Sequence, residues 1–254
     1  MHKKERKQEH SGILRRMWHF IWYDESALSW AVNFILAFIL IKFIFYPGLG
    51  MILGTSLPAV AVISGSMDHS VQQGMLCGER VSEQAVFWDV CGSWYEERGI
   101  TYEQFLEFPF ARGFSKGDIM LVRGVTKETA NIGDVIIFQS NKAYPIIHRI
   151  VAIDEYITAK GDHNEAPIEQ YVLLQGNFAY ECYVQQGETR ILASCLDVNA
   201  QRVDFQTPGA VALLDETRIT DEQLIGKAFA RIPYLGYIRI LFGELLARLG
   251  IGSL

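Results

Sequence analysis

The longest uninterrupted apolar segment of the chain covers residues 27–46, and Lys42 is its only charged residue. At about 1.5 Å per residue, a helix of this length crosses a hydrocarbon core about 30 Å thick. Lys42 lies near one end, where its side chain can reach the interface. A cleaved signal peptide and a buried core helix are the alternatives, but the run is long for either, and no small-x-small cleavage pattern follows it directly. We therefore predict a permanent membrane anchor over 27–46, broken by Pro47, Gly48 and Gly50.

Beyond the anchor, the pattern changes to short runs of β-branched and apolar residues separated by turn residues, which is typical of β-strands. Two of these runs are each preceded by Gly-Asp, a frequent turn signal. The pattern predicts a mainly β domain over 47–231. The runs cover residues 58–63, 119–125, 135–139, 145–153 and 225–236.

Two segments depart from this pattern, and we interpret both as insertions into the domain. Residues 70–112 combine acidic, aromatic and cysteine residues, with a helical pattern in "TYEQFLEF" over 101–108. Residues 171–217 contain further short alternating runs. The tail, residues 232–254, has apolar residues near helical spacing, which predicts an amphipathic helix. Its charges make it a poor span, and both a membrane surface and the domain remain open as its partner.

The distribution of charge predicts the orientation of the chain. The net charge is −6 over 254 residues, which gives no electrostatic support to nucleic-acid binding. The first 28 residues contain six basic and four acidic side chains, so the rest of the chain carries −8. Basic segments beside a membrane span stay on the cytoplasmic side. We therefore predict a cytoplasmic segment over 1–26, a single-pass anchor in the cell membrane and an extracytoplasmic domain.

All the cysteines follow the anchor, where an oxidising environment permits disulfides. The four are Cys77, Cys91, Cys182 and Cys195. The local pairings are Cys77–Cys91 and Cys182–Cys195, although four cysteines allow three pairings. The chain contains no Cys-x-x-Cys pattern, which disfavours a structural zinc site.

A Ser-Gly-Ser sequence, with Ser64 and Ser66, lies in "VISGSMDHS" shortly after the anchor. A flexible linker is the simplest interpretation, but a serine beside a base is a nucleophile. His148 is the strongest candidate base, because Asp162 follows it in "KGDHN" and the order Ser, His, Asp is one that a catalytic triad can take. A lone histidine in a strand is usually a satisfied core or edge residue, and by spacing alone the signal for a base at His148 is weak. A metal site from His148, Asp162 and His163 is disfavoured, because adjacent residues of an extended chain point apart.

Six short segments follow one another along the chain: "VISGSMDHS", "FSKGDIMLVRG", "IGDVIIF", "PIIHRIVAI", "KGDHN" and "IGKAFARIPYLG". Their order is that of type I signal peptidases, and the chain resembles the archaeal and endoplasmic-reticulum branch of this family. Bacterial members have a lysine as the base, and here His148 takes its place. The resemblance covers about 40–69, 113–165 and 224–237, and the two insertions match nothing in the family.

The resemblance implies a membrane-bound serine endopeptidase, with a mainly antiparallel β fold, that removes signal peptides from exported preproteins after a small-x-small motif. Ser66 matches the nucleophile, Ser64 the oxyanion donor, His148 the general base and Asp162 the acid. The strand that includes Val62 and Ile63 would pair with an extended substrate. No metal or cofactor is implied. The expected partners are signal-peptide-bearing preproteins, membrane lipid and the protein-export channel.

One departure leaves the identity of the acid open. The family has a second aspartate a few residues after the Gly-Asp-x-Asn segment, but the corresponding stretch here, "NEAPIEQY", contains no aspartate. Asp215 and Glu169 are therefore alternatives to Asp162. A different class of function, a non-catalytic membrane-anchored assembly or scaffold protein on a peptidase fold, is the alternative to the enzyme.

Overall fold

A computed structural model describes the backbone of residues 5–175, 178–180, 182–186, 189–193, 210–238 and Leu241. Side chains are described for residue 12 and for 15–171, 211–238 and Leu241. The chain divides into two compact units, Met1–Ile52 and Leu53–Leu254. The first unit is helical and the second contains the sheets.

The described residues contain one helix long and apolar enough to span a membrane, Ala27–Leu53. It comprises α2 (Ala27–Leu40), a π-helical turn (Ile41–Phe45) and α3 (Tyr46–Leu53), and it follows helix α1 (Glu5–Tyr23). The side chain of Ser26 caps α2 by accepting a hydrogen bond from the backbone N–H of Ser29.

The prediction that Pro47, Gly48 and Gly50 break the helix is wrong, because α3 continues through all three. A proline inside a regular α-helix clashes with the carbonyl group four residues earlier. Here a wider turn precedes Pro47, and the backbone N–H of Tyr46 bonds to the oxygen of Ile41, five residues back. This π-helical turn lets the helix pass the proline, so the apolar helix extends to Leu53.

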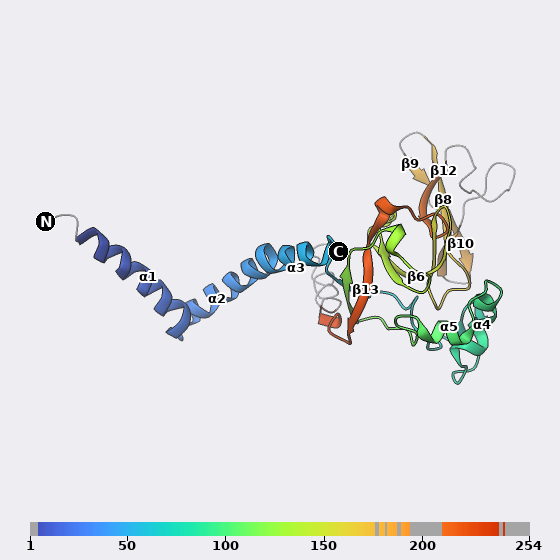
Figure 1. The fold of residues 1–254 in the computed structure, drawn as a ribbon, viewed down its shortest axis with the longest axis horizontal. Helices are drawn as coiled ribbons and strands as arrows, with labels where there is room; N and C mark the ends of the chain where they lie inside the picture. The colour runs from blue at the N-terminus through green and yellow to red at the C-terminus, as the bar shows by residue number, and fades with distance from the viewer. Residues whose placement is uncertain are drawn as a thin grey trace. The chain divides into compact units, whose positions relative to one another are not determined.

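The centre of the second unit is an antiparallel sheet of six strands in the order β1-β4-β13-β5-β6-β7 (Figure 1). The prediction of a mainly β domain is confirmed, and each predicted run contains a strand. β1 is shorter than expected and forms one edge of the sheet. The strands are β1 (Ala59–Ala61), β4 (Ile119–Arg123), β5 (Val135–Phe138), β6 (Ile146–Ile153), β7 (Ile157–Lys160) and β13 (Leu224–Ile232). Short 3₁₀ turns lie at Lys127–Thr129 and Asp221–Gln223.

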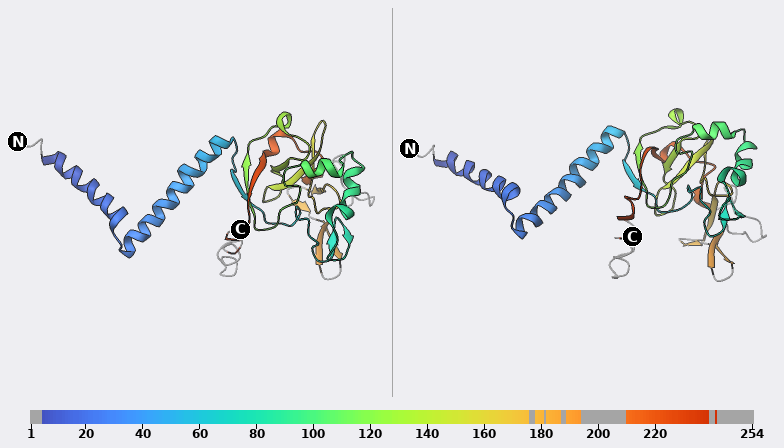
Figure 2. Two further views of the ribbon diagram at one scale, coloured as in Figure 1. Left: turned by 60° about the horizontal axis from the view of Figure 1, so that its bottom comes forward. Right: turned by 90° about the horizontal axis from the view of Figure 1, so that it is seen from below.

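Residues 70–112 form a compact helical segment beside the sheet, in which α4 and α5 lie next to each other (Figures 1 and 2). Its elements are β2 (Met75–Leu76), β3 (Glu79–Arg80), α4 (Phe87–Glu96) and α5 (Tyr102–Glu107). Cys77 and Cys91, one of the two local pairings, form a disulfide that joins the β2–β3 hairpin to α4. The apolar core of the helical segment is continuous with the sheet, because Phe87, Tyr95 and Phe105 cluster with Val151 of β6.

Residues 171–217 contain the strands of two smaller sheets, ordered β12-β8-β9 and β10-β11. The strands are β8 (Glu169–Gln175), β9 (Phe178–Tyr180), β10 (Cys182–Gln186), β11 (Thr189–Ala193) and β12 (Ala210–Asp215). Both views in Figure 2 show these strands, coloured orange, extending beyond the six-stranded sheet. The predicted pairing Cys182–Cys195 and most of the predicted tail lie outside the described residues.

Candidate active site

Ser66 and His148 lie within hydrogen-bond distance, although 82 positions separate them in the chain. Ser66 is in the turn that follows β1, and its Oγ is 2.9 Å from Nε2 of His148 on β6. The hydroxyl oxygens of Ser64 and Ser66 are 3.1 Å apart. The structure therefore brings together the predicted nucleophile, the predicted oxyanion donor and the predicted base.

The other ring nitrogen of His148, Nδ1, contacts Oε1 of Glu216. Both side chains are almost completely buried. A carboxylate is an acceptor only, so we assign the neutral imidazole a proton on Nδ1, donated to Glu216. This tautomer leaves the lone pair of Nε2 facing the Ser66 hydroxyl. A general base needs this arrangement.

Glu216 directly follows β12 and lies beside β7, where its backbone oxygen accepts a hydrogen bond from the N–H of Ala159 at 2.8 Å. Ala159 is opposite Ile150 on β6, and Ile150 points to the same side of the strand as His148. The second carboxylate oxygen of Glu216, Oε2, accepts from the backbone N–H of Ile168 at 2.8 Å. Two partners thus hold the buried carboxylate in place.

The expectation that the Asp162 carboxylate meets the His148 ring is corrected by the structure. Its two oxygens bond to the Arg149 guanidinium at 2.9 and 2.7 Å, to Tyr95 at 3.1 Å and to Nε2 of His69 at 2.9 Å. Arg149 is the neighbour of His148 on β6, and adjacent strand residues point to opposite faces. Asp162 therefore lies on the opposite face of the strand from the Ser66–His148 pair.

Arg149 and Asp162 are both fully buried, and each has its hydrogen-bonding groups satisfied. Besides Asp162, the guanidinium donates to the backbone oxygens of Pro109, Phe110 and Gly133. Burial alone would raise the pKa of Asp162, but the charge of Arg149 and the hydrogen bond from His69 hold this pKa well below its usual range. The carboxylate is ionised at neutral pH. Asp162 and Arg149 form a buried ion pair, and removing one partner of such a pair is strongly destabilising because the other charge stays buried.

The alternative acids, Asp215 and Glu169, lie where β12 pairs with β8. Asp215 accepts hydrogen bonds from the hydroxyl of Tyr171 and from the backbone N–H and hydroxyl of Thr217. Glu169 begins β8, opposite Asp215 in the strand register. Glu216 was missed because it fell at the end of the segment interpreted as an insertion. The sequence held one signal for Glu216, which is its position next to the candidate acid Asp215. Neighbouring residues at the end of a strand point to opposite faces, so a strand that brings one of them to His148 turns the other away.

The turn that carries Ser66 is held by the loop after β7. The backbone N–H of His163 donates to the oxygen of Ser66 at 2.8 Å, and Nδ1 of His163 lies 3.0 Å from the oxygen of Asp68. On the other side, the N–H of Phe114 donates to the oxygen of Met67 at 3.0 Å. Backbone hydrogen bonds from two segments thus fix the nucleophile relative to the base.

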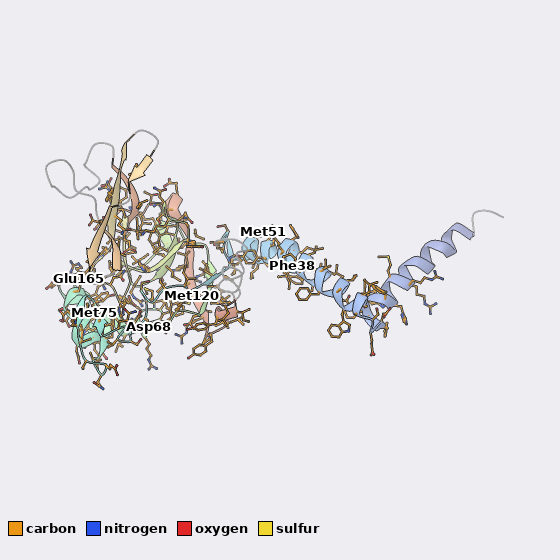
Figure 3. The ribbon with its side chains drawn as sticks, turned by 180° about the vertical axis from the view of Figure 1, so that it is seen from behind. Phe38, Met51, Asp68, Met75, Met120 and Glu165 are labelled. Atoms are coloured by element: carbon orange, nitrogen blue, oxygen red, sulfur yellow. A yellow bond between two sulfur atoms is a disulfide. The ribbon has the colours of Figure 1, made fainter. Side chains whose placement is uncertain are left out.

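The helical segment 70–112 also contacts these loops. Nε2 of Gln72 donates to the oxygen of Gly65, and the ring of Phe87 stacks on His69 with centroids 3.6 Å apart. The backbone N–H of Cys77 donates to the oxygen of His163 at 3.1 Å. Asp68, Met75 and Glu165 are labelled on this side of the unit, and Met120 marks the sheet (Figure 3). The segment interpreted as an insertion thus supports the two loops of the site.

Lys160 is a second buried cation next to this network. Its ammonium group donates to the backbone oxygens of Gly161 and Asp162 and lies over the rings of Trp94 and Tyr95. Burial lowers the pKa of Lys160 to about 8, against the opposing charge of Asp162. Lys160 ties the loop that carries Gly161 and Asp162 to α4.

We predict that Gly161→Ala lowers turnover about a hundredfold with the fold intact. A Cβ atom at this position would lie 2.7 Å from Nε2 of His148 and 2.9 Å from the backbone oxygen of Ser66, so the base or the nucleophile turn must move. A displacement of about 1 Å costs on the order of a hundredfold in rate. The measurement is kcat/KM with circular dichroism as a check of the fold. Gly48→Ala, where a Cβ meets nothing within 4 Å, is the control, and full activity of Gly161→Ala would contradict the geometry.

We predict that the double substitution Cys77→Ser, Cys91→Ser lowers the free energy of unfolding by about 3 kcal/mol, the value for a closed loop of about 15 residues. The disulfide closes a segment of similar length, with a sequence separation of 14. Because Cys77 also bonds to the loop of His163, turnover should fall at temperatures where the wild type remains folded. Denaturant unfolding and activity against temperature measure both effects, with Ser93→Ala in α4 as control. An unchanged unfolding curve would refute this role.

β1 lies at one edge of the six-stranded sheet, with β4 as its neighbour. Val62 is buried and bonded through its backbone to Asp118 and Gly117, whereas the side chain of Ile63 is exposed. Among the described side chains, no group of three or more His, Cys, Asp or Glu residues is arranged to hold a metal ion. The groups that the structure brings together at the site are serine, imidazole and carboxylate. Comparisons of the chain with protein-family models and with curated proteins gave no match.

Proposed function

We propose that the protein is a membrane-bound serine endopeptidase that removes signal peptides from exported preproteins. The observation that carries this proposal is the continuous arrangement of Ser66, His148 and Glu216, joined by two hydrogen bonds. It is supported by the position of Ser66 in the chain, shortly after a helix long enough to span a membrane. The order of short segments that resembles type I signal peptidases agrees with both.

In the proposed mechanism, Oγ of Ser66 attacks the scissile carbonyl carbon while its proton moves to Nε2 of His148. The carboxylate of Glu216 holds the ring and stabilises its protonated form. The hydroxyl of Ser64 and the backbone N–H of Ser66 donate to the oxyanion, and loss of one such donor costs roughly a hundred- to a thousandfold in rate. His148 then passes the proton to the leaving amine, and water hydrolyses the acyl-enzyme.

The substrate would bind as an added strand along β1 and the residues that follow it, including Val62 and Ile63. Backbone hydrogen bonds provide affinity in this mode, and pockets for alternate side chains provide specificity. Small side chains one and three residues before the cut fit this alternation. A scissile bond just beyond the apolar part of a signal peptide lies at the membrane surface. A nucleophile 13 residues after Leu53, the last residue of the apolar helix, is suited to such a bond.

The proposed topology places residues 1–26 in the cytoplasm and the sheet domain outside. The basic N-terminal flank favours this orientation. Proteolysis of sealed inside-out and right-side-out vesicles measures it. Digestion of the sheet domain only in right-side-out vesicles is expected, and digestion only in inside-out vesicles would reverse the assignment.

Incubation of the detergent-solubilised full chain with a preprotein that carries a small-x-small motif tests the activity. We expect cleavage after the motif by the wild type and by Ser82→Ala, an exposed serine outside the site, and none by Ser66→Ala or His148→Ala. Equal cleavage by Ser66→Ala would remove the mechanism. Wild-type protein that binds the preprotein without cutting it would favour the scaffold function.

A further inference from the structure

The side-chain amide of Asn164 lies in the loop that supports Ser66, and its nitrogen Nδ2 is buried without an acceptor among the described residues. The backbone N–H of Asn164 closes the turn by donating to the oxygen of Gly161 at 2.9 Å. A buried donor that lacks a partner costs free energy, typically about 1–3 kcal/mol. It is the one buried side-chain nitrogen or oxygen in the described part of the chain with this property. Such a group next to a catalytic pair points to a ligand.

The surroundings of Gly161 locate this amide. The ideal Cβ position of Gly161 lies 2.7 Å from Nδ2 of Asn164, 2.7 Å from Nε2 of His148 and 2.9 Å from the backbone oxygen of Ser66. The two nitrogens are therefore separated by at most twice 2.7 Å. One water molecule that makes two hydrogen bonds of about 2.9 Å spans a separation of this size.

We propose that Asn164 is a catalytic residue that orients the hydrolytic water in the second half of the reaction. This inference rests on the proposed peptidase function and assigns a step within it. After acylation, Oγ of Ser66 is bonded to the acyl group, so Nε2 of His148 needs a new proton donor. A water molecule that donates one hydrogen to Nε2 and accepts one from the Asn164 amide keeps its second lone pair for attack.

The atoms balance in this step. The water oxygen forms a bond to the acyl carbon as its proton moves to Nε2, and the tetrahedral intermediate then breaks the bond to Oγ of Ser66. The proton returns from Nε2 to Oγ, which regenerates the serine, and the carboxylic acid leaves. The amide of Asn164 donates throughout and is neither protonated nor consumed.

The assignment to the water follows from the neighbours of the amide. The amide nitrogen Nδ2 and the base nitrogen Nε2 both lie 2.7 Å from the ideal Cβ position of Gly161. Ser64, the proposed oxyanion donor, is not among the three atoms nearest to that position. An amide N–H cannot replace the base, because it has no basic lone pair. A donor beside the base fits the oxygen of a water molecule that the base activates.

The test separates acylation from deacylation. A p-nitrophenyl ester of a peptide that ends in a small-x-small motif acylates rapidly, so steady-state turnover reports deacylation and the initial burst of p-nitrophenol reports acylation. For Asn164→Ala we expect a burst rate within about threefold of wild type, and steady-state turnover lower by roughly a hundredfold, the usual cost of one donor to a transition state. Intact-mass measurement should show the acyl group on the variant.

The controls keep the outcomes distinct. Asn131→Ala, an exposed asparagine outside the site, should behave as wild type. Asn164→Asp, of similar size but without a donor when ionised, should also accumulate the acyl-enzyme. Equal losses in the burst and the steady state, or no loss, would overturn the proposal, as would the failure of both variants to fold. A wild type that neither cleaves the preprotein nor acylates would instead refute the proposed function.

Discussion

Glu216→Gln is expected to lower kcat/KM about ten-thousandfold while the fold stays intact, the effect known for the loss of an orienting carboxylate in a triad. Oε2 of Glu216 accepts a hydrogen bond from the backbone N–H of Ile168, so the glutamine oxygen must occupy that position. The amide NH₂ then faces Nδ1 of His148 and can only donate to it. His148 is forced to carry its proton on Nε2, where it cannot accept the proton of Ser66.

The kinetic comparison with three other carboxylates identifies the acid. Glu169→Gln, Asp215→Asn and Asp162→Asn should each retain turnover within about tenfold of wild type per folded molecule, because Nδ1 of His148 contacts Glu216 and its Nε2 contacts Ser66. Steady-state kinetics on a preprotein, normalised by active-site titration, measures the effect. Near-normal turnover of Glu216→Gln together with a large loss in one of the other variants would move the role to that residue.

Asp162→Asn is expected to lower the free energy of unfolding by about 3–5 kcal/mol, the cost of removing one partner of a buried ion pair. The substitution leaves the fully buried guanidinium of Arg149 without a counter-charge. It also weakens the hydrogen bonds to Tyr95 and His69, which join the helical segment and the nucleophile turn to the sheet. Denaturant unfolding at pH 7 measures the loss.

The pH dependence of this effect follows from the lowered pKa of Asp162. A carboxyl group whose pKa is lower in the folded than in the unfolded state contributes stability above its unfolded pKa, about 3.9, and loses it as the pH falls. The difference in the free energy of unfolding between wild type and Asp162→Asn should therefore have its full size at pH 7 and shrink below about pH 4. Asp154→Asn, an exposed carboxylate, should change little at either pH. An unchanged difference at pH 3 would contradict the assignment of the ion pair.

The pattern of the sequence was sufficient for the elements whose signal is local. The long apolar run predicted the helix that begins at Ala27, and runs of β-branched residues predicted the strands of the main sheet. Local disulfide pairings could be proposed because the cysteines lie close together in the chain, but only the structure selected Cys77–Cys91 among the possible pairings. Pro47 was misjudged, because a turn of π-helix changes which carbonyl group the proline meets. The π-helical turn depends on backbone geometry, which the helix propensities of the individual residues do not predict.

The sequence by itself determined which residue types could carry chemistry: a serine after a span-length helix, one histidine in a β run, and several carboxylates beyond it. Only the tertiary structure decided which carboxylate meets the histidine. Side chains alternate across a strand, so a shift of one position moves a group to the other face of the sheet. Asp162 reaches Arg149 on one face, and Glu216 reaches His148 on the other. His148 and Glu216 are 68 positions apart in the chain, so no local pattern records which carboxylate reaches the ring.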